Sequence, residues 1–256
     1  GGAFTQQLLK VTNAGGTLVP ALTYDAAETT QYLVRVGASN LFGSGRLQVY
    51  SLTGTIGSIT FNTIPFASIG PAWSISLPNA KQLGSTATIE TNDDRLMNAV
   101  IRNGRLWTVH NVAFDTTTRD HSAIKWWELT PANGTVIQSG LIEDVGADGL
   151  FDNTTGRYYY YPSIAVNKNN EVLVGFSGSG ALEYASTYYA YRSPTYAAGL
   201  TDIPFKYKAG LGIYSGPRWG DYSATVVDPS DDTTFWTVQQ FAAGGNKGAN
   251  YWAQVG

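Results

Sequence analysis

The feature that most constrains the fold of this chain is a short apolar pattern that occurs four times. Two apolar residues, any residue and a third apolar residue appear at 33–36, 106–109, 173–176 and 235–238. The second positions of the four copies lie 73, 67 and 62 residues apart, at Val34, Trp107, Val174 and Trp236. Self-similarity at such a period predicts an architecture in which each copy contributes one unit of the same kind.

The residues around each copy indicate antiparallel strands. An upstream apolar run ends in turn residues in every copy, at Asp25, Asn103-Gly104, Asn167 and Asp228-Pro229, so each pair of runs reads as a hairpin. A third, aromatic-rich run follows at 46–52, 124–129, 187–192 and 251–255. A fourth run follows the first three copies only, at 58–64, 135–142 and 204–208. The run at 4–11 is a candidate for the strand that the last copy lacks.

These repeats predict an all-β fold, a β-propeller of four-stranded antiparallel blades, because radial repetition of short strands leaves few exposed sheet edges. The prediction is a single domain over 1–256, with blades at about 20–65, 95–143, 157–209 and 218–256 and an N-terminal strand at 4–11. Either that strand pairs beside 251–255 and closes the ring, or another chain completes a larger ring. A β-sandwich is the alternative fold, and no helical apolar stripe is present.

The composition narrows the setting and the class of partner. Only 14% of the residues are charged and the net charge is −3, so a nucleic-acid partner is not expected and a neutral or small ligand fits better. The chain has no cysteine and no apolar stretch long enough to span a bilayer. Many Gly, Tyr and Trp residues suit an exported protein, and we expect a bacterial protein that is secreted or displayed on the cell surface.

Candidate ligand-binding residues lie in the loops that enter the blades. Arg95, Arg157 and Arg218 each occupy such a loop, and Arg157 and Arg218 share the pattern Arg-x-x-x-Tyr with Tyr161 and Tyr222. Long loops at 110–121, 177–186 and 239–250 are predicted on the same face. Converging guanidinium groups suit a carboxylate, and aromatic side chains such as Trp219 suit sugar rings. The alternative is that these residues brace neighbouring blades.

One acidic loop is a candidate metal site. The segment 143–153 combines glycines with Asp144, Asp148 and Asp152, the oxygen ligands that Ca²⁺ prefers. A solvated turn is the alternative, and no other cofactor is expected. His110 and His121, the two histidines, are predicted to be loop residues rather than zinc ligands.

Two segments resemble known proteins. The motif Arg218-Trp219-Gly220-Asp221-Tyr222-Ser223, followed by 228–236, resembles the closing blade of a group of secreted bacterial propeller proteins. Over about 90–256 the repeat resembles the sialidase-like propeller superfamily of the Asp-box (BNR) type. That resemblance implies an arginine clamp for a carboxylate, a tyrosine nucleophile assisted by a glutamate, and an aspartate acid/base. The matching candidates are Arg95, Arg157 and Arg218 for the clamp, Tyr222 or Tyr161 for the nucleophile, and Asp93, Asp94 or Asp221 for the acid. No glutamate is identified as the assisting residue, and Glu183 is the only candidate in the loops.

Three functions follow from these observations. The first is an extracellular recognition or scaffold propeller that binds a glycan or a protein through its loop face. The second is a carbohydrate-active enzyme, a sialidase-like glycoside hydrolase or a polysaccharide lyase that uses the Arg, Tyr and Asp side chains of the loops. The third is a structural subunit of a larger extracellular assembly. The scaffold alone does not choose between them, because a fold does not determine a function.

Overall fold

The computed structural model describes residues 5–11, 16–37, 45–65, 67–68, 73, 76–113, 121–145, 150–220 and 223–256. Every regular element in these ranges is a β-strand, so the described part of the chain is all-β. None of it forms a helix that is long and apolar enough to cross a membrane.

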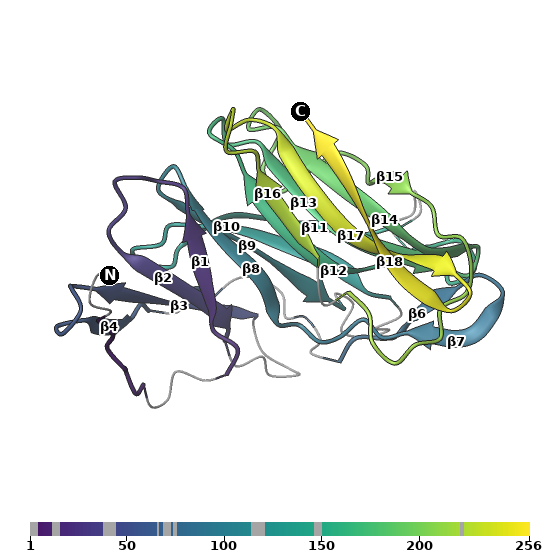
Figure 1. Cartoon of the computed structure of the whole chain (residues 1–256), viewed down its shortest axis with the longest axis horizontal. Helices are drawn as coiled ribbons and strands as arrows, with labels where there is room; N and C mark the ends of the chain where they lie inside the picture. The colour runs from purple at the N-terminus through teal and green to yellow at the C-terminus, as the bar shows by residue number, and fades with distance from the viewer. Residues whose placement is uncertain are drawn as a thin grey trace.

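Most strands fall into four antiparallel units that follow one another along the chain (Figure 1). Unit 1 contains β1 (Val19–Thr23), β2 (Gln31–Val36), β3 (Arg46–Thr53) and β4 (Thr60–Thr63). Unit 2 contains β8 (Leu96–Arg102), β9 (Arg105–Val112), β10 (Ala123–Leu129) and β11 (Val136–Ile142). Unit 3 contains β12 (Arg157–Val166), β13 (Val172–Gly180), β14 (Glu183–Arg192) and β15 (Phe205–Lys208). Unit 4 contains β16 (Ala224–Val227), β17 (Phe235–Gly244) and β18 (Lys247–Val255).

Two features depart from simple repetition of the units. Strand β1 pairs in parallel with β8, which joins units 1 and 2 into one curled sheet of nine strands that includes the short β5 (Ala67–Ser68). A separate hairpin of β6 (Ala80–Gln82) and β7 (Ser85–Ile89) lies between units 1 and 2 in the sequence. It contacts unit 3, where the Ser179 hydroxyl donates to the backbone oxygen of Lys81 at 2.7 Å.

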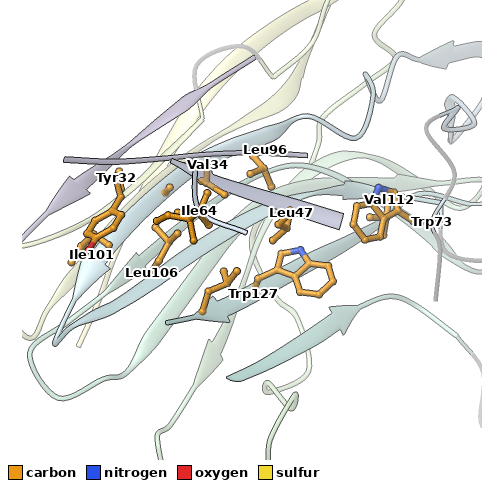
Figure 2. Close-up of a cluster of buried hydrophobic side chains, with 14 of the residues drawn as sticks. Tyr32, Val34, Leu47, Ile64, Trp73, Leu96, Ile101, Leu106, Val112 and Trp127 are labelled. Atoms are coloured by element: carbon orange, nitrogen blue, oxygen red, sulfur yellow. The ribbon is translucent and has the colours of Figure 1, made fainter. Parts of the chain in front are cut away.

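Unit 2 is buried on both faces because successive side chains of a strand point to opposite sides of the sheet. Leu106 and Trp127 pack against unit 1, in the cluster that Figure 2 shows, together with Val34 and Leu47. Their sequence neighbours Trp107 and Trp126 pack against unit 3 instead. Burying an aliphatic or aromatic side chain of this size contributes about 1.5–3 kcal/mol relative to leaving it exposed, so this alternation strongly favours stacking of the units.

Units 3 and 4 stack in the same way. Ala165 and Leu173 of unit 3 form a cluster with Val227 and Phe235 of unit 4. Next to it, the buried hydroxyls of Ser163 and Thr225 lie 2.7 Å apart and link the two units by a hydrogen bond. The chain therefore builds a series of units in which each contacts the next through buried side chains.

The turns between the first and second strands of the four units interlock at one end of the molecule. The carboxylate of Asp25 accepts a hydrogen bond from the backbone N–H of Asn103 at 2.8 Å. The Asn103 amide donates to the backbone oxygen of Lys168 at 3.1 Å, and the Lys168 N–H donates to the oxygen of Asp232 at 3.2 Å. The turn residues that mark the repeat in the sequence thus bond one unit to the next.

The predicted strand at 4–11 is not found. Phe4 lies outside the described residues, and residues 5–11 form no strand. The side chain of Gln7 instead accepts a hydrogen bond from the N–H of Gly57, in the turn between β3 and β4, at 2.6 Å. Among the described strands β18 pairs with β17 alone, so its outer edge is open.

Two predicted loops are also corrected. The segments 177–186 and 239–250 are mostly strand, because β13 runs to Gly180 and β17 runs to Gly244. The Gly/Ser-rich end of β13 is buried, and a Cβ at Gly178 would press against the ring of Tyr159. Glycine is required there by close packing, so a composition typical of loops occurs in a core strand.

Candidate functional site

The candidate site residues lie at the end of the molecule opposite the interlocked turns. The connections that enter units 2, 3 and 4 meet this end, since Leu96, Arg157 and Ala224 begin the first strand of each unit. The turn between β13 and β14 meets it too, because Arg157 pairs with Gly180 and Gly180 pairs with Glu183.

A group of charges at this end surrounds Arg157, and we call it the Arg157 cluster: Asp144, Arg157, Glu183, Tyr188 and Lys206. The Arg157 guanidinium donates from Nε to Glu183 Oε2 at 2.8 Å and from Nη1 to Asp144 Oδ2 at 3.0 Å. Its backbone N–H reaches the same Asp144 oxygen at 2.9 Å. On the other side, Glu183 Oε1 accepts from Lys206 Nζ at 3.1 Å and from the Tyr188 hydroxyl. Two carboxylates and two cations are therefore paired.

The pKa shifts in the Arg157 cluster follow from this pairing. Burial raises the pKa of Glu183, but hydrogen bonds from Tyr188, Arg157 and Lys206 outweigh burial and hold the pKa below its usual value. Burial and the neighbouring Glu183 charge raise the pKa of Tyr188 well above that of a free phenol. At neutral pH Glu183 is therefore an anion, and the protonated Tyr188 hydroxyl donates a hydrogen bond to it.

Two cavities flank the Arg157 cluster, and both are bordered by Asp144 and Arg157. The larger has a volume of 980 Å³, and its walls combine charged groups with the apolar side chains of Leu150, Phe151 and Leu182. The smaller has a volume of 560 Å³ and is lined in part by Tyr159, Tyr188 and Lys206. Apolar and aromatic walls with a few fixed polar groups are typical of sites for small ligands.

A second group of predicted residues surrounds Tyr161. This tyrosine is buried and has a φ of 52°, in the left-handed region that a residue with a side chain rarely adopts. Its N–H donates to Asn111 Oδ1 at 2.9 Å, and Gly220 lies so close that a Cβ there would overlap its ring. Arg95 pairs with Asp93 at 2.7 Å and lies near enough to Tyr161 for the two to interact electrostatically.

Asp94 belongs to a buried network beside this group. The Trp73 indole donates to Asp94 Oδ2 at 2.8 Å, and burial raises the pKa of the Asp94 carboxyl despite this hydrogen bond. His110, predicted to be a loop residue, lies within β9 and is fully buried. Its ring shares a hydrogen bond with the Asp94 backbone oxygen at 2.8 Å and accepts one from Trp127 at 3.0 Å. Burial lowers the pKa of His110 to about 4.

The three predicted clamp arginines lie in different surroundings. Arg157 borders the two cavities of its cluster, Arg95 pairs within its own loop, and Arg218 borders another cavity of 390 Å³ together with Trp219. The structure therefore brings Arg95, Tyr161 and Gly220 together but does not gather the arginines around one ligand. Asp221 and Tyr222 lie outside the described residues.

The predicted calcium ligands have protein partners where they are described. Asp144 accepts from Arg157, and Asp152 accepts from the hydroxyls of Thr154 and Thr155 at 2.6 Å each. Asp148 lies outside the described residues. In the ranges that the structure covers, no three His, Cys, Asp or Glu side chains are grouped so as to hold a metal ion.

Sequence reasoning named Arg157, Asp144 and Glu183 but missed Tyr188, Lys206 and Phe151. Tyr188 and Lys206 are paired neighbours across β14 and β15, and Phe151 comes from the connection before β12. Only the alternation of Tyr188 along its predicted strand could have indicated the face on which it lies.

No family model matches this chain, and no curated protein matches it. Several solved structures are similar at low identity. An α-L-arabinanase of Penicillium chrysogenum, complexed with arabinobiose, is 12% identical, with a TM-score of 0.44 over 88% of this chain and 59% of its own. A GH93 α-L-arabinofuranosidase of Fusarium graminearum is 12% identical, with a TM-score of 0.42 over 93% of this chain and 75% of its own.

An exo-β-1,3-galactanase from Clostridium thermocellum is 13% identical, with a TM-score of 0.42 over 92% of this chain and 45% of its own. This chain thus spans only part of these enzymes, and 38% of a GH43_12 protein from a capybara gut metagenome. The named structures are glycoside hydrolases, whereas the resemblance to sialidase-like propellers is not confirmed. TM-scores below 0.5 do not assign the activity of these enzymes to this chain.

Proposed function

We propose that this chain is a β-propeller whose four units are its blades, and that it binds a glycan in the 980 Å³ cavity beside Arg157. The blade arrangement is supported by the stacking of each unit on the next and by the interlocked turns. Tyr24, which follows β1, also lies near the backbone of Val227 in β16.

One observation carries the proposed ligand class. Arg157 is held rigidly by Asp144 and Glu183 at the border of a cavity whose other walls include Phe151 and Leu182. A guanidinium group has five N–H donors, and the paired carboxylates provide acceptors, so sugar hydroxyls find both kinds of partner. The ring of Phe151, which stacks on His121 at 4.0 Å between centroids, adds an apolar wall to the cavity against which a sugar ring can pack. Glycan binding outside the cell, at a secreted or surface location, agrees with the composition.

The test is a screen of neutral glycans, followed by calorimetry on the neutral oligosaccharide that binds best. Replacing Arg157 with alanine should weaken binding at least tenfold, which corresponds to about 1.4 kcal/mol. The control is Arg105→Ala, because Arg105 is also a partly exposed arginine that pairs with a carboxylate, Glu128, but it begins β9 at the end with the interlocked turns. Equal affinity of the Arg157→Ala protein and the wild type would refute the proposed site.

Glycoside hydrolysis is the second candidate function, and the hydrogen bond from the Tyr188 hydroxyl to Glu183 favours it. A tyrosine beside a carboxylate can act as a nucleophile, as in sialidases, if the carboxylate takes its proton. Asp144 and Glu183 both contact one guanidinium, which keeps their carboxyl groups within about 10 Å, the range that glycosidases use. The raised pKa of Tyr188 opposes its ionisation, so Glu183 must act as the base.

Turnover of fluorogenic arabinosides, galactosides and sialosides tests this second function. Tyr188→Phe keeps the ring and removes the hydroxyl, and Glu183→Gln removes the base. If hydrolysis occurs here, both variants should lose at least 100-fold in kcat, while Tyr188→Phe should still bind the sugar. A wild-type protein that binds glycans but releases no fluorophore from any substrate would leave recognition as the function.

A further inference from the structure

The outer face of unit 4 carries a row of side chains that none of the other described units covers. On β17 and β18 the cross-strand pairs Val238–Trp252 and Gln240–Asn250 lie on this face, with Val226 of β16 beside them. The opposite side, with Phe235 and Phe241, is buried toward unit 3. Trp252 is 62% exposed and Val226 is 42% exposed, so the outer face is open to solvent.

Two indoles form a fixed apolar surface on this face. The rings of Trp236 and Trp252 lie 5.2 Å apart between centroids at an interplanar angle of 46°. Trp236 is anchored because its Nε1–H donates to Asp228 Oδ2 at 2.8 Å. An exposed tryptophan held against an anchored one is pre-organised to receive the flat face of a ligand, which lowers the entropy cost of binding.

Polar side chains lie beyond the indoles on the same face, toward the end of the molecule opposite the interlocked turns, which we call the loop end. Gln240 Oε1 accepts from the N–H of Gly220 at 2.7 Å, which fixes the amide. Gly248 provides room for that amide, since a Cβ there would overlap Gln240 Nε2. These residues line a cavity of 390 Å³ that Arg218 and Asn250 also border. The surface therefore changes from aromatic to amide to cationic along one direction.

We propose that this face is a second glycan site, separate from the Arg157 cavity, and that its ligand is an oligosaccharide containing a uronic acid. A pyranose ring stacks on Trp252, the amides of Gln240 and Asn250 bond to hydroxyl groups, and Arg218 pairs with the sugar carboxylate. A guanidinium matches a carboxylate geometrically, which favours an acidic sugar over a neutral one. The hollow, polar loop end favours a sugar over the apolar sheet of a second copy.

The experiment is calorimetry and tryptophan fluorescence with trigalacturonate and with its methyl ester, which is neutral but has the same sugar rings. The wild type should bind the acid at least tenfold more tightly than the ester, and the preference should fall as salt is raised. Arg218→Gln should remove the preference while binding of the ester persists. Trp252→Ala should weaken binding of both sugars at least tenfold.

The Arg157→Ala protein separates the two sites, because it should bind trigalacturonate as the wild type does. If the cavity beside Arg157 binds no glycan, the binding of trigalacturonate at unit 4 is still expected. Sedimentation velocity on the wild-type and Trp252→Ala proteins tests whether a second copy of the chain occupies this face instead. Unchanged trigalacturonate binding in both Trp252→Ala and Arg218→Gln would overturn the proposal. A concentration-dependent dimer that Trp252→Ala abolishes would also overturn it and would make the face an interface between copies.

Discussion

Replacing Glu183 with glutamine tests the electrostatics of the Arg157 cluster, because it removes one charge and keeps the shape of the side chain. Glu183 is 12% exposed and accepts from Arg157, Lys206 and Tyr188. A hydrogen bond to a charged group is worth about 1.5–3 kcal/mol, but Arg157 and Lys206 are more than a third exposed and therefore screened. We expect a loss of about 2 kcal/mol at pH 7, or roughly 4–8 °C in Tm.

The loss should depend on pH in one direction. The folded protein lowers the pKa of Glu183, so the stabilisation is complete above the unfolded value of about 4.3 and is lost as pH falls through the folded value. Urea unfolding at pH 7, 5 and 3 should therefore show a difference between wild type and Glu183→Gln that shrinks at acid pH. Glu90→Gln, at an exposed position, is the control. A difference that is equal at every pH would refute the reasoning.

Three further predictions concern the contacts between and within units, each measured by urea unfolding. Gly175→Ala places a methyl group against Thr237 at the junction of units 3 and 4, and it should lower the free energy of unfolding by about 1–3 kcal/mol. The control Gly16→Ala, which has open space around it, should change the free energy of unfolding little. Equal effects of the two substitutions would contradict the stacking of units 3 and 4. Asn98→Ala removes the amide that hydrogen-bonds to both the N–H and the C=O of Ile164, and it should lower the free energy of unfolding by about 2–4 kcal/mol. A loss below about 1 kcal/mol would show that this amide does not link units 2 and 3. His110 has a pKa of about 4 in the folded protein, so the free energy of unfolding of the wild type should fall by up to about 3 kcal/mol between pH 6.5 and pH 4. In His110→Gln this dependence on pH should be weaker. An unchanged dependence would show that another group titrates.

The strands of this fold could be predicted from sequence wherever apolar residues alternate. Trp107 and Trp126 face one neighbour and Leu106 and Trp127 face the other, so both faces of unit 2 carry a sequence signal. The ends of β13 and β17 carried no such signal, because the glycines of both strands and the serines of β13 are typical of loops. Only the packing of Tyr159 over Gly178 explains why this segment is a buried strand.

The candidate site was predictable in part. Arg157 and Glu183 stand beside turns, where charged residues suggest function, and the sequence singled out both. The contact of Lys206 with Glu183 depends on the register between β14 and β15, which shifts at Thr187/Tyr188. No local pattern encodes that shift, so the pairing of Glu183 with Lys206 emerges only in the folded chain. Arg95, Arg157 and Arg218 occupy similar loops in the sequence, but only the folded chain shows that their surroundings differ.

The most direct test of the account is a crystal structure of the wild-type protein with the oligosaccharide that binds best in the screen. The account predicts a sugar residue in the 980 Å³ cavity, within hydrogen-bond distance of Arg157 and stacked near Phe151. An empty cavity at Arg157, in a crystal where the same sugar is bound elsewhere on the molecule, would contradict it.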